Sequence, residues 1–220
     1  MIKTVQYFLF VLFTGLLLCA NNVSAQTGIT IDASQQMTTF EFTSSDGNID
    51  NSYSPIYTGA YHFGYSYFLD NGIYFNAGIG MRNAGATMAI DATNLRWDFK
   101  YGQGKLGGGY MYELGRINPY LGIAGYYARL LTANQRINDP KRENINYDLL
   151  ESGSILENDY GLLITPGVRL SASEYISVYT EFSYLMGLQN LQPGDTGQEA
   201  INAGYAITLG VSFNLINKDE

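Results

Sequence analysis

The alternation of apolar and polar residues is clearest near the C-terminus, in Ile201–Leu215. Every second residue of this segment, beginning with Ile201, is apolar, and the residues between are small or polar. Because successive side chains of a β-strand point to opposite faces, the segment predicts a strand with one apolar face. In a soluble sandwich this face would meet a second sheet; in an outer-membrane barrel it would meet lipid.

The same alternation predicts seven earlier strands, and Gln26–Gln36 is either a short lead-in or the start of the first strand. These strands are Met37–Ser45, Ile56–Leu69, Ile73–Asn83, Leu95–Leu114, Pro119–Thr132, Asp159–Ser171 and Tyr175–Gly187. The alternation changes phase across Gly102–Lys105, which we interpret as a bulge in one long strand whose upper half projects beyond the bilayer. A hairpin turned at the same residues is the alternative and would add a strand.

Short and long connections alternate along the chain. The short turns are Asp70–Gly72, Gly115–Asn118 and Ala172–Glu174, and the long loops are Ser44–Pro55, Ala84–Asn94, Ala133–Asn158 and Leu188–Ala200. Outer-membrane barrels have short periplasmic turns and longer extracellular loops. The pattern therefore predicts an all-β, antiparallel transmembrane β-barrel of about eight strands, with ten possible, and with both termini at the periplasmic rim.

The N-terminal segment predicts export. Lys3 precedes an apolar run, Tyr7–Cys19, and Val23–Ala25 supplies small residues before a cut at Ala25/Gln26. The run is shorter than the ~20 residues that a membrane-spanning helix needs. We expect residues 1–25 to be a signal peptide and residues 26–220 to be the barrel, in the outer membrane of a Gram-negative bacterium. Lipidation at Cys19 is the alternative, although Leu18 stands where a small residue is expected.

Composition and charge support β structure and exclude some partners. The chain has 19 Tyr, 11 Phe and 25 Gly, a composition that favours strands. Its net charge is −8 and it contains no basic run, so a nucleic-acid partner is not expected. Cleavage would remove the one cysteine, leaving no disulfide in the mature protein.

Two segments resemble the small outer-membrane β-barrel domain family, PorT-like or OmpA/OmpX-like. Lys105–Leu114, followed by Asn118–Gly125, is similar to the family's paired central strands. The second segment, similar to the C-terminal signal read by the barrel-assembly machinery, consists of Thr208, Gly210, Phe213 and Leu215. The resemblance covers nearly all of the mature region and implies an outer-membrane barrel. Its implied partners are outer-membrane lipid, lipopolysaccharide and the assembly machinery, and it implies no catalytic site.

Three motifs that suggest cofactor or active-site chemistry have simpler explanations. Gly102–Gly107 matches the dinucleotide pattern G-x-G-x-x-G, but strand follows strand where the motif needs a helix. Asp46–Asp50 has the spacing of a calcium loop, but Asn51 replaces the required glycine and Tyr57 the bidentate glutamate. His62, the one histidine, is predicted to face the lumen as a polar residue. We therefore expect no enzyme activity, cofactor or metal site.

Five ionisable residues are predicted to form a charge cluster in the lumen. They are Arg82, Glu113, Arg169, Glu181 and His62. The interior of an eight-stranded barrel is just wide enough to be filled by side chains, and unpaired buried charges are costly. We expect carboxylate–guanidinium pairs to plug the lumen, with Glu113 and Arg169 near the periplasmic end. The alternative is that these charges are scattered in lumen water.

These predictions favour a structural or interaction role. Ala133–Asn158, the longest loop, is the best candidate contact region for an extracellular partner protein. One alternative is a narrow passive pore for small solutes. A second is a soluble periplasmic lipid-binding barrel with its apolar faces turned inward, and a third is a component of a secretion machine.

Overall fold

The computed structural model describes residues 25–50, 52–139, 144–192, 194 and 198–215. The predicted signal peptide, including Cys19, lies outside the described residues except for Ala25. The tail after Leu215 lies outside them as well. No helix in the described part of the chain is long and apolar enough to cross a membrane.

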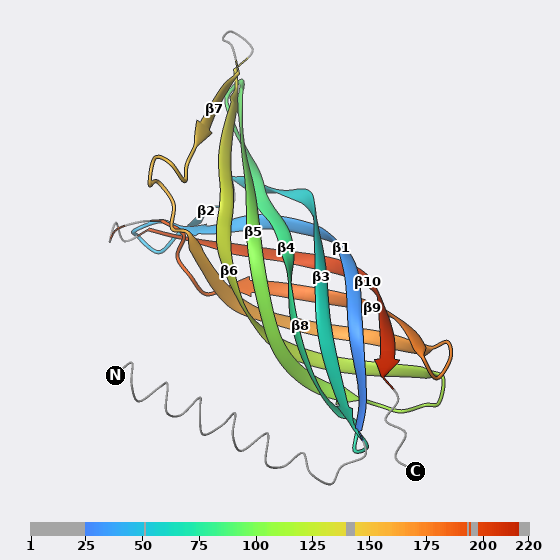
Figure 1. Cartoon of the computed structure of the whole chain (residues 1–220). Coiled ribbons are helices and arrows are strands. Elements are labelled where there is room, and N and C mark those ends of the chain that lie inside the picture. Colours follow the sequence, from blue (N-terminus) through green and yellow to red (C-terminus); the bar gives the residue numbers. More distant parts are fainter. Residues whose placement is uncertain (1–24, 51, 140–143, 193, 195–197, 216–220) are drawn as a thin grey trace, which may run out of the picture.

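Eight long antiparallel strands close into a barrel (Figure 1). They are β1 (Ala25–Thr43), β3 (Tyr53–Leu69), β4 (Ile73–Ile90), β5 (Thr93–Met111), β6 (Ile117–Asn138), β8 (Asn158–Ser171), β9 (Ile176–Gly187) and β10 (Glu199–Leu215). Two short strands, β2 (Ile49–Asp50) and β7 (Ile145–Asp148), lie in the connections. Closure comes from β1, which pairs with β3 on one side and with β10 on the other. The predicted antiparallel barrel is confirmed, and the two strands beyond eight belong to loops.

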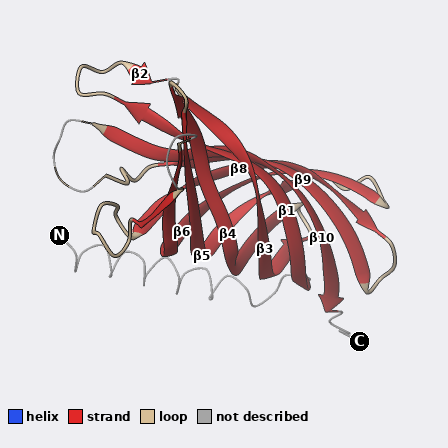
Figure 2. Cartoon of the chain, turned by 90° about the horizontal axis from the view of Figure 1, so that it is seen from above, coloured by secondary structure: helices blue, strands red, loops and turns tan. Residues whose placement is uncertain are grey.

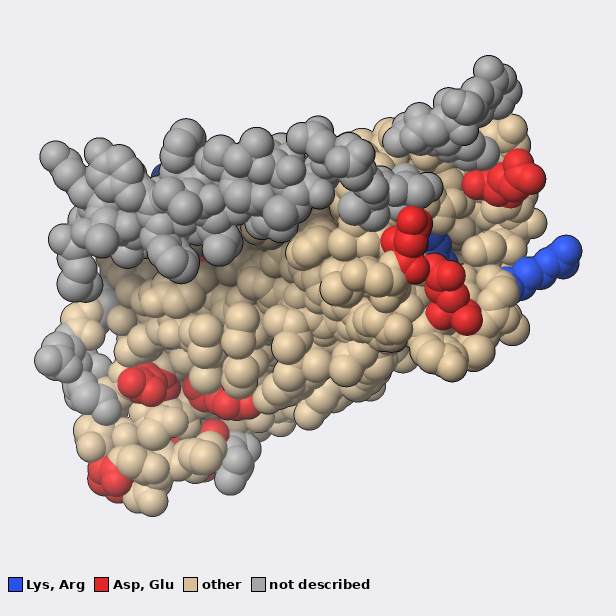
Figure 3. Space-filling model, turned by 90° about the horizontal axis from the view of Figure 1, so that it is seen from below, with Lys and Arg blue, Asp and Glu red and all other residues tan. Residues whose placement is uncertain are grey.

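The barrel turns its apolar side chains outward. On β10, Ile207 and Leu209 are 60% and 65% exposed, whereas Thr208 and Ser212 are 4% and 1% exposed. The other wall strands show the same division, and Figure 3 shows an uncharged wall with charged side chains gathered toward its two ends. This orientation is the opposite of the one that a soluble lipid-binding barrel needs, so that alternative is wrong.

Gln26–Gln36 is the start of the first strand and not a separate lead-in, because it continues into Met37 as part of β1. One connection differs from the prediction. The predicted loop Ala84–Asn94 is mostly strand: β4 and β5 remain paired up to Ile90 and Thr93, and the two-residue turn begins at Asp91, with φ of 52°. At the start of this segment Ala84 is buried in the wall, at 1% exposed.

The β-bulge lies on β6 instead of β5. Lys100 pairs with Thr132 and Tyr101 pairs with Leu130, so Leu131 is the extra residue. β5 keeps one phase throughout, and its upper aromatic residues, such as Phe99, point inward because the lumen is apolar at that end. The bulge reverses the alternation on β6, so that Arg136 lies on the outward face.

The long connections gather at one end of the barrel. Beyond the other strands, β4, β5 and β6 continue as an extension on which β7 adds a further strand (Figures 1 and 2). The turns between β3 and β4, between β5 and β6 and between β8 and β9 lie at the opposite end, near the start of β1 and the end of β10. The predicted asymmetry of the two rims is present, except at the short β4–β5 turn.

Candidate functional site: the barrel lumen

The loop end of the lumen is filled by an apolar group that we call the mouth cluster. Its strand-borne members include Phe40, Phe99, Leu130 and Leu185, and its loop members are Leu149, Leu150, Ile155 and Leu191. Phe40 packs its ring 5.3 Å from that of Phe99 and 6.3 Å from that of Trp97. Burial of each large apolar side chain contributes about 1.5–3 kcal/mol, so these loop residues belong to the packed structure.

Backbone hydrogen bonds fasten the two long loops across the mouth. The Leu156 N–H donates to the Leu191 carbonyl at 2.8 Å, and the Leu191 N–H donates to the Ala200 carbonyl at 2.8 Å. The Leu130 N–H on β6 donates to the Glu157 carbonyl at 2.7 Å. The loop that precedes β8 and the loop that precedes β10 therefore act together as one cover.

Below the mouth cluster, a buried ion pair crosses the lumen. Arg82 on β4 donates from Nη2 to Asp159 Oδ2 on β8, and the two residues are 1% and 0% exposed. Asn202 Nδ2 donates to the same carboxylate at 2.9 Å. The Arg82 guanidinium also lies 4.7 Å from the ring centre of Tyr101 and 5.1 Å from that of Tyr126. Charge pairing and aromatic contact together offset the cost of burying this cation.

Asp32 on β1 is the centre of the next level. Its Oδ1 lies 2.9 Å from His62 Nδ1, and its Oδ2 accepts from Tyr179 Oη at 3.2 Å and from Lys105 Nζ at 3.4 Å. Four strands, β1, β3, β5 and β9, are joined through this one carboxylate. Glu181 lies nearby and accepts a hydrogen bond from Tyr120 Oη at 2.8 Å.

At the turn end, Arg169 is buried without a carboxylate partner among the described residues. Its Nη2 donates to Asn214 Oδ1 at 2.6 Å, and its guanidinium lies 4.1 Å from the ring centre of Phe68. Asn214 Nδ2 in turn donates to Ser177 Oγ at 3.3 Å. A neutral amide and an aromatic face hold this cation, where we predicted an ion pair.

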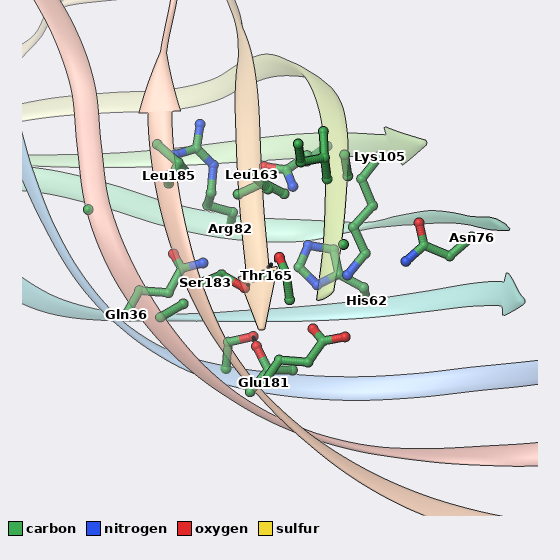
Figure 4. Close-up of a pocket in the computed structure, with 18 of the residues that line it drawn as sticks. Gln36, His62, Asn76, Arg82, Lys105, Leu163, Thr165, Glu181, Ser183 and Leu185 are labelled. Atoms are coloured by element: carbon green, nitrogen blue, oxygen red, sulfur yellow. Dashed lines mark hydrogen bonds between the residues drawn. The ribbon is translucent and has the colours of Figure 1, made fainter. Parts of the chain in front are cut away.

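Two small cavities remain within the lumen, each of about 50 Å³. The first lies between Arg82 and Glu181, and Figure 4 shows His62, Lys105 and Gln36 around it. The second lies toward Arg169 and Phe68. Each has room for a few water molecules, far less than the 300–1,000 Å³ of a typical ligand pocket.

The structure brings together part of the predicted charge cluster. Arg82, Arg169 and His62 are buried in the lumen and Glu181 is partly buried there. Glu113 is not in the lumen: β5 ends at Met111, so Glu113 lies exposed in the turn and cannot pair with Arg169. The prediction that Glu113 belongs to the lumen charge cluster is wrong for this reason.

Three lumen residues were missed from the sequence: Asp32, Lys105 and Asp159. Asp32 was placed in the lead-in, Lys105 in a supposed bulge, and Asp159 at a strand end. Continuing the alternation of the first strand backward, with Ile31 outward, would have placed Asp32 inward.

The four residues of the predicted assembly signal divide between the two faces of β10. Thr208 and Gly210 face the lumen, whereas Phe213 and Leu215 are 43% and 45% exposed on the outside. Gly210 has a packing role of its own, since a Cβ there would lie 2.2 Å from Tyr179 Cζ. Recognition by the assembly machinery stays a prediction.

The calcium-like segment is held by its own turn. The Asp46 carboxylate accepts hydrogen bonds from the Ser44 hydroxyl and from Asn48 Nδ2, and these bonds lower the pKa of Asp46. Asp50 Oδ1 accepts from the Ser52 N–H at 2.8 Å. Both carboxylates therefore have a structural use in the β1–β3 connection.

A closed antiparallel cylinder with an apolar exterior and a polar interior defines the outer-membrane β-barrel fold. The chain is similar in structure to Neisserial surface protein A, with 12% identity and a TM-score of 0.53, over 87% of this chain and 99% of that one. It is also similar to the outer membrane protein OprG of Pseudomonas aeruginosa, with 10% identity and a TM-score of 0.52, over 86% and 97% of the two chains.

At these identities the similarity shows the fold alone. No family model matches the chain, and no curated protein matches it. The outer-membrane barrel fold that the OmpA/OmpX-like resemblance implied is therefore confirmed, while the PorT-like assignment stays a prediction.

Proposed function

We propose that this chain is an outer-membrane β-barrel of a Gram-negative bacterium, with a closed lumen and a role in structure or surface contact. The observation that supports closure best is the filling of the lumen at successive levels. The mouth cluster covers the loop end, the Arg82–Asp159 pair lies below it, and Arg169 with Phe68 fills the turn end. The exposed apolar wall supports a lipid environment.

Membrane fractionation tests the location. The full chain, expressed in a Gram-negative host, should be found with the outer membrane on a density gradient and should require detergent for release. The folded barrel should also migrate differently on a gel before and after heating. Recovery in the soluble periplasmic fraction would contradict the proposal.

Conductance in planar bilayers tests closure. The wild-type barrel should give no stable single-channel steps, because no described passage runs through the packed levels. The two small cavities keep a narrow pore as the alternative, since Glu181 lines both of them. Steps in the wild type whose ion selectivity shifts in Arg169→Gln and Glu181→Gln variants would establish the pore.

We propose no catalytic role for the lumen. His62 Nδ1 is held by Asp32, and the residue is 7% exposed inside a covered barrel, where a substrate from either end has no route to it. Incubation with esters, phospholipids and peptides should show no turnover above that of a His62→Gln variant. Turnover lost in that variant would contradict the proposal.

The proposed contact surface is narrower than the predicted loop Ala133–Asn158. Residues 133–138 belong to β6 and residues 145–148 to β7, while Leu149 and Ile155 pack on the mouth cluster. We therefore place the contact surface on the part of the extension that β5, β6 and β7 form. Cross-linking on whole cells, through cysteines placed on this contact surface, tests for an extracellular or secretion-complex partner. Absence of any cross-linked adduct would count against both kinds of partner.

A further inference from the structure

A polar pocket lies on the outward face of the extension, and we call it the Arg–Asn pocket. It has a volume of about 480 Å³ and is lined by Arg96, Asn134, Arg136, Asn138, Asn144 and Asn146. This volume is within the range of pockets that bind small ligands. The pocket lies outside the lumen and outside the mouth cluster, so the proposal of a closed barrel assigns no function to it.

Strand register brings the lining residues together. Arg96 on β5 is directly opposite Arg136 on β6, which is directly opposite Asn146 on β7. The β6 residues reach this face because of the bulge at Leu131; unbroken alternation from Leu121 would have turned Arg136 to the other face.

The two guanidinium groups share one carboxylate. Asp98 lies 2.9 Å from Arg96 and 3.6 Å from Arg136, and the Arg136 side chain is still 57% exposed. Like charges directly opposite on a sheet are destabilising, and one carboxylate neutralises only one of the two cations. The nearby Asp148 carboxylate accepts instead from the N–H of Leu150, at 2.9 Å, and that of Glu151. Asp148 does not line the pocket, so the charged side chains that do are the two arginines, and Asp98 pairs with both of them.

The four asparagine side chains supply neutral donors and acceptors beside the charge. Within the described residues, none of these four carboxamides makes a side-chain hydrogen bond. A carboxamide can donate to and accept from a sugar hydroxyl at the same time, whereas guanidinium binds phosphate oxygens in pairs. A ligand that carries both hydroxyl and phosphate groups fits this combination.

Other cations share the same wall. Of the four exposed Lys and Arg residues in the described part of the chain, Lys100, Arg129 and Arg136 lie on the outward face of β5 and β6. The fourth, Arg116, lies at the opposite end. Leu106, 70% exposed on the apolar wall, lies on β5 ten residues after Arg96, about 33 Å along the strand. The pocket is thus beyond the apolar part of the wall.

We propose that the Arg–Asn pocket binds a phosphorylated saccharide, with the two arginines on the phosphate and the asparagines on the hydroxyl groups. The sugar–phosphate headgroup of lipopolysaccharide and a soluble phosphorylated glycan share this chemistry. The first source rests on the proposed outer-membrane location; the second does not.

Calorimetric titration of the mature barrel in detergent micelles tests the pocket. The probe is a phosphorylated core oligosaccharide from deacylated lipopolysaccharide, and the comparison probe is the same oligosaccharide after phosphatase treatment. Arg136→Gln should weaken binding of the phosphorylated probe about tenfold or more, and should not change binding of the dephosphorylated one. Asn146→Ala should weaken binding of both probes.

The matched control is Arg129→Gln, which removes an exposed cation outside the pocket and should leave binding within about twofold of wild type. Heat-dependent gel mobility shows that each variant has folded. The proposed binding site would be wrong if the wild type did not bind the phosphorylated oligosaccharide, or if Arg129→Gln and Arg136→Gln lost equal affinity for it.

Native mass spectrometry of barrels released from micelles that contain lipopolysaccharide distinguishes the two sources. One lipopolysaccharide retained by wild type and lost in Arg136→Gln assigns the membrane lipid, whereas binding of the oligosaccharide without retained lipid assigns a soluble glycan. If the barrel neither retains lipopolysaccharide nor binds the oligosaccharide, the proposal that the pocket binds a phosphorylated saccharide is wrong. A failed fractionation with intact oligosaccharide binding would instead overturn only the proposed location.

Discussion

At the scale of single residues, the lumen holds two buried arginines by different means. Arg82 has a carboxylate, Asp159, while Arg169 has an amide oxygen and the face of Phe68. Removal of either member of a buried ion pair leaves the other charge buried and uncompensated. Each arginine therefore stabilises the barrel through its buried partner: Arg82 through Asp159, and Arg169 through the Asn214 amide oxygen and the Phe68 ring.

Arg82→Ala should destabilise the barrel by about 3–5 kcal/mol, because Asp159 would remain buried without its cation. Urea unfolding of the micelle-bound barrel measures this change. Asp159→Asn in the same background should recover part of the loss. Arg129→Ala is the control: its pair with Glu157 is exposed, at 69% and 52%, and should cost no more than about 1 kcal/mol. Equal losses of unfolding free energy in Arg82→Ala and Arg129→Ala would contradict a stabilising role for the buried Arg82–Asp159 pair.

Gly210→Ala should also destabilise the barrel, by about 1–3 kcal/mol, because the new methyl group would displace the ring of Tyr179. The displaced ring would lose its hydrogen bond to Asp32. Gly125→Ala is the matched strand control, since a Cβ there meets nothing within 4 Å. Unfolding midpoints of the two variants in urea should therefore differ, and a larger loss at Gly125 would refute the packing role.

The faces of these residues could be predicted from the sequence, but their partners could not. Alternation alone places Arg82 and Arg169 inward. Arg82 and Asp159 lie on β4 and β8, which are not neighbours in the sheet, so their contact depends on the diameter and stagger of the closed barrel. No periodicity along the chain contains that information. The prediction for Glu113 was wrong because β5 ends at Met111, three residues before the predicted end at Leu114.

At the scale of elements, the bulge at Leu131 determines which side of the extension is polar. Below it, Leu121 and Tyr127 face outward; above it, Ala133 is buried and Arg136 is exposed. A sequence pattern shows a change of phase but not which of two paired strands carries the extra residue. That ambiguity is why the bulge was predicted at Gly102–Lys105 on β5 and was found on β6.

Cysteine labelling tests this reversal. A membrane-impermeant maleimide should react readily with Arg136→Cys and slowly with Ala133→Cys, whose wild-type residue is 0% exposed. Arg129→Cys, below the bulge and outward in any register, serves as the positive control. Rapid reaction at Ala133 with protection at Arg136 would mean that β6 runs without the bulge.

At the scale of the whole molecule, the exterior separates a membrane barrel from a soluble one. The outward faces carry large exposed apolar side chains on all eight wall strands, and the polar atoms are enclosed. This division was predictable, because it needs only the alternation within each strand. The covered mouth was not, since it arises from loops whose apolar residues, such as Leu191, have no periodic pattern.

Leu209→Arg should cost about 2–4 kcal/mol when the barrel is folded into lipid vesicles, because Leu209 is 65% exposed near the middle of β10, where we expect the apolar wall to contact hydrocarbon. Leu215→Arg, near the rim, should cost at most about 1 kcal/mol. Urea titration of tryptophan fluorescence in vesicles compares them, with Trp97 as the reporter. If both substitutions are neutral, the wall does not contact hydrocarbon.

The pairing of β1 with β10 has a consequence for biogenesis. Thr27 and Leu215 are neighbours in space but lie at opposite ends of the described chain. Until the ribosome has released the last strand, the first has no partner on one side, and every shorter intermediate has two open edges prone to aggregation. We therefore expect the chain to reach the membrane in an unfolded form, and a chain truncated within the seventeen residues of β10 should be degraded instead of inserted.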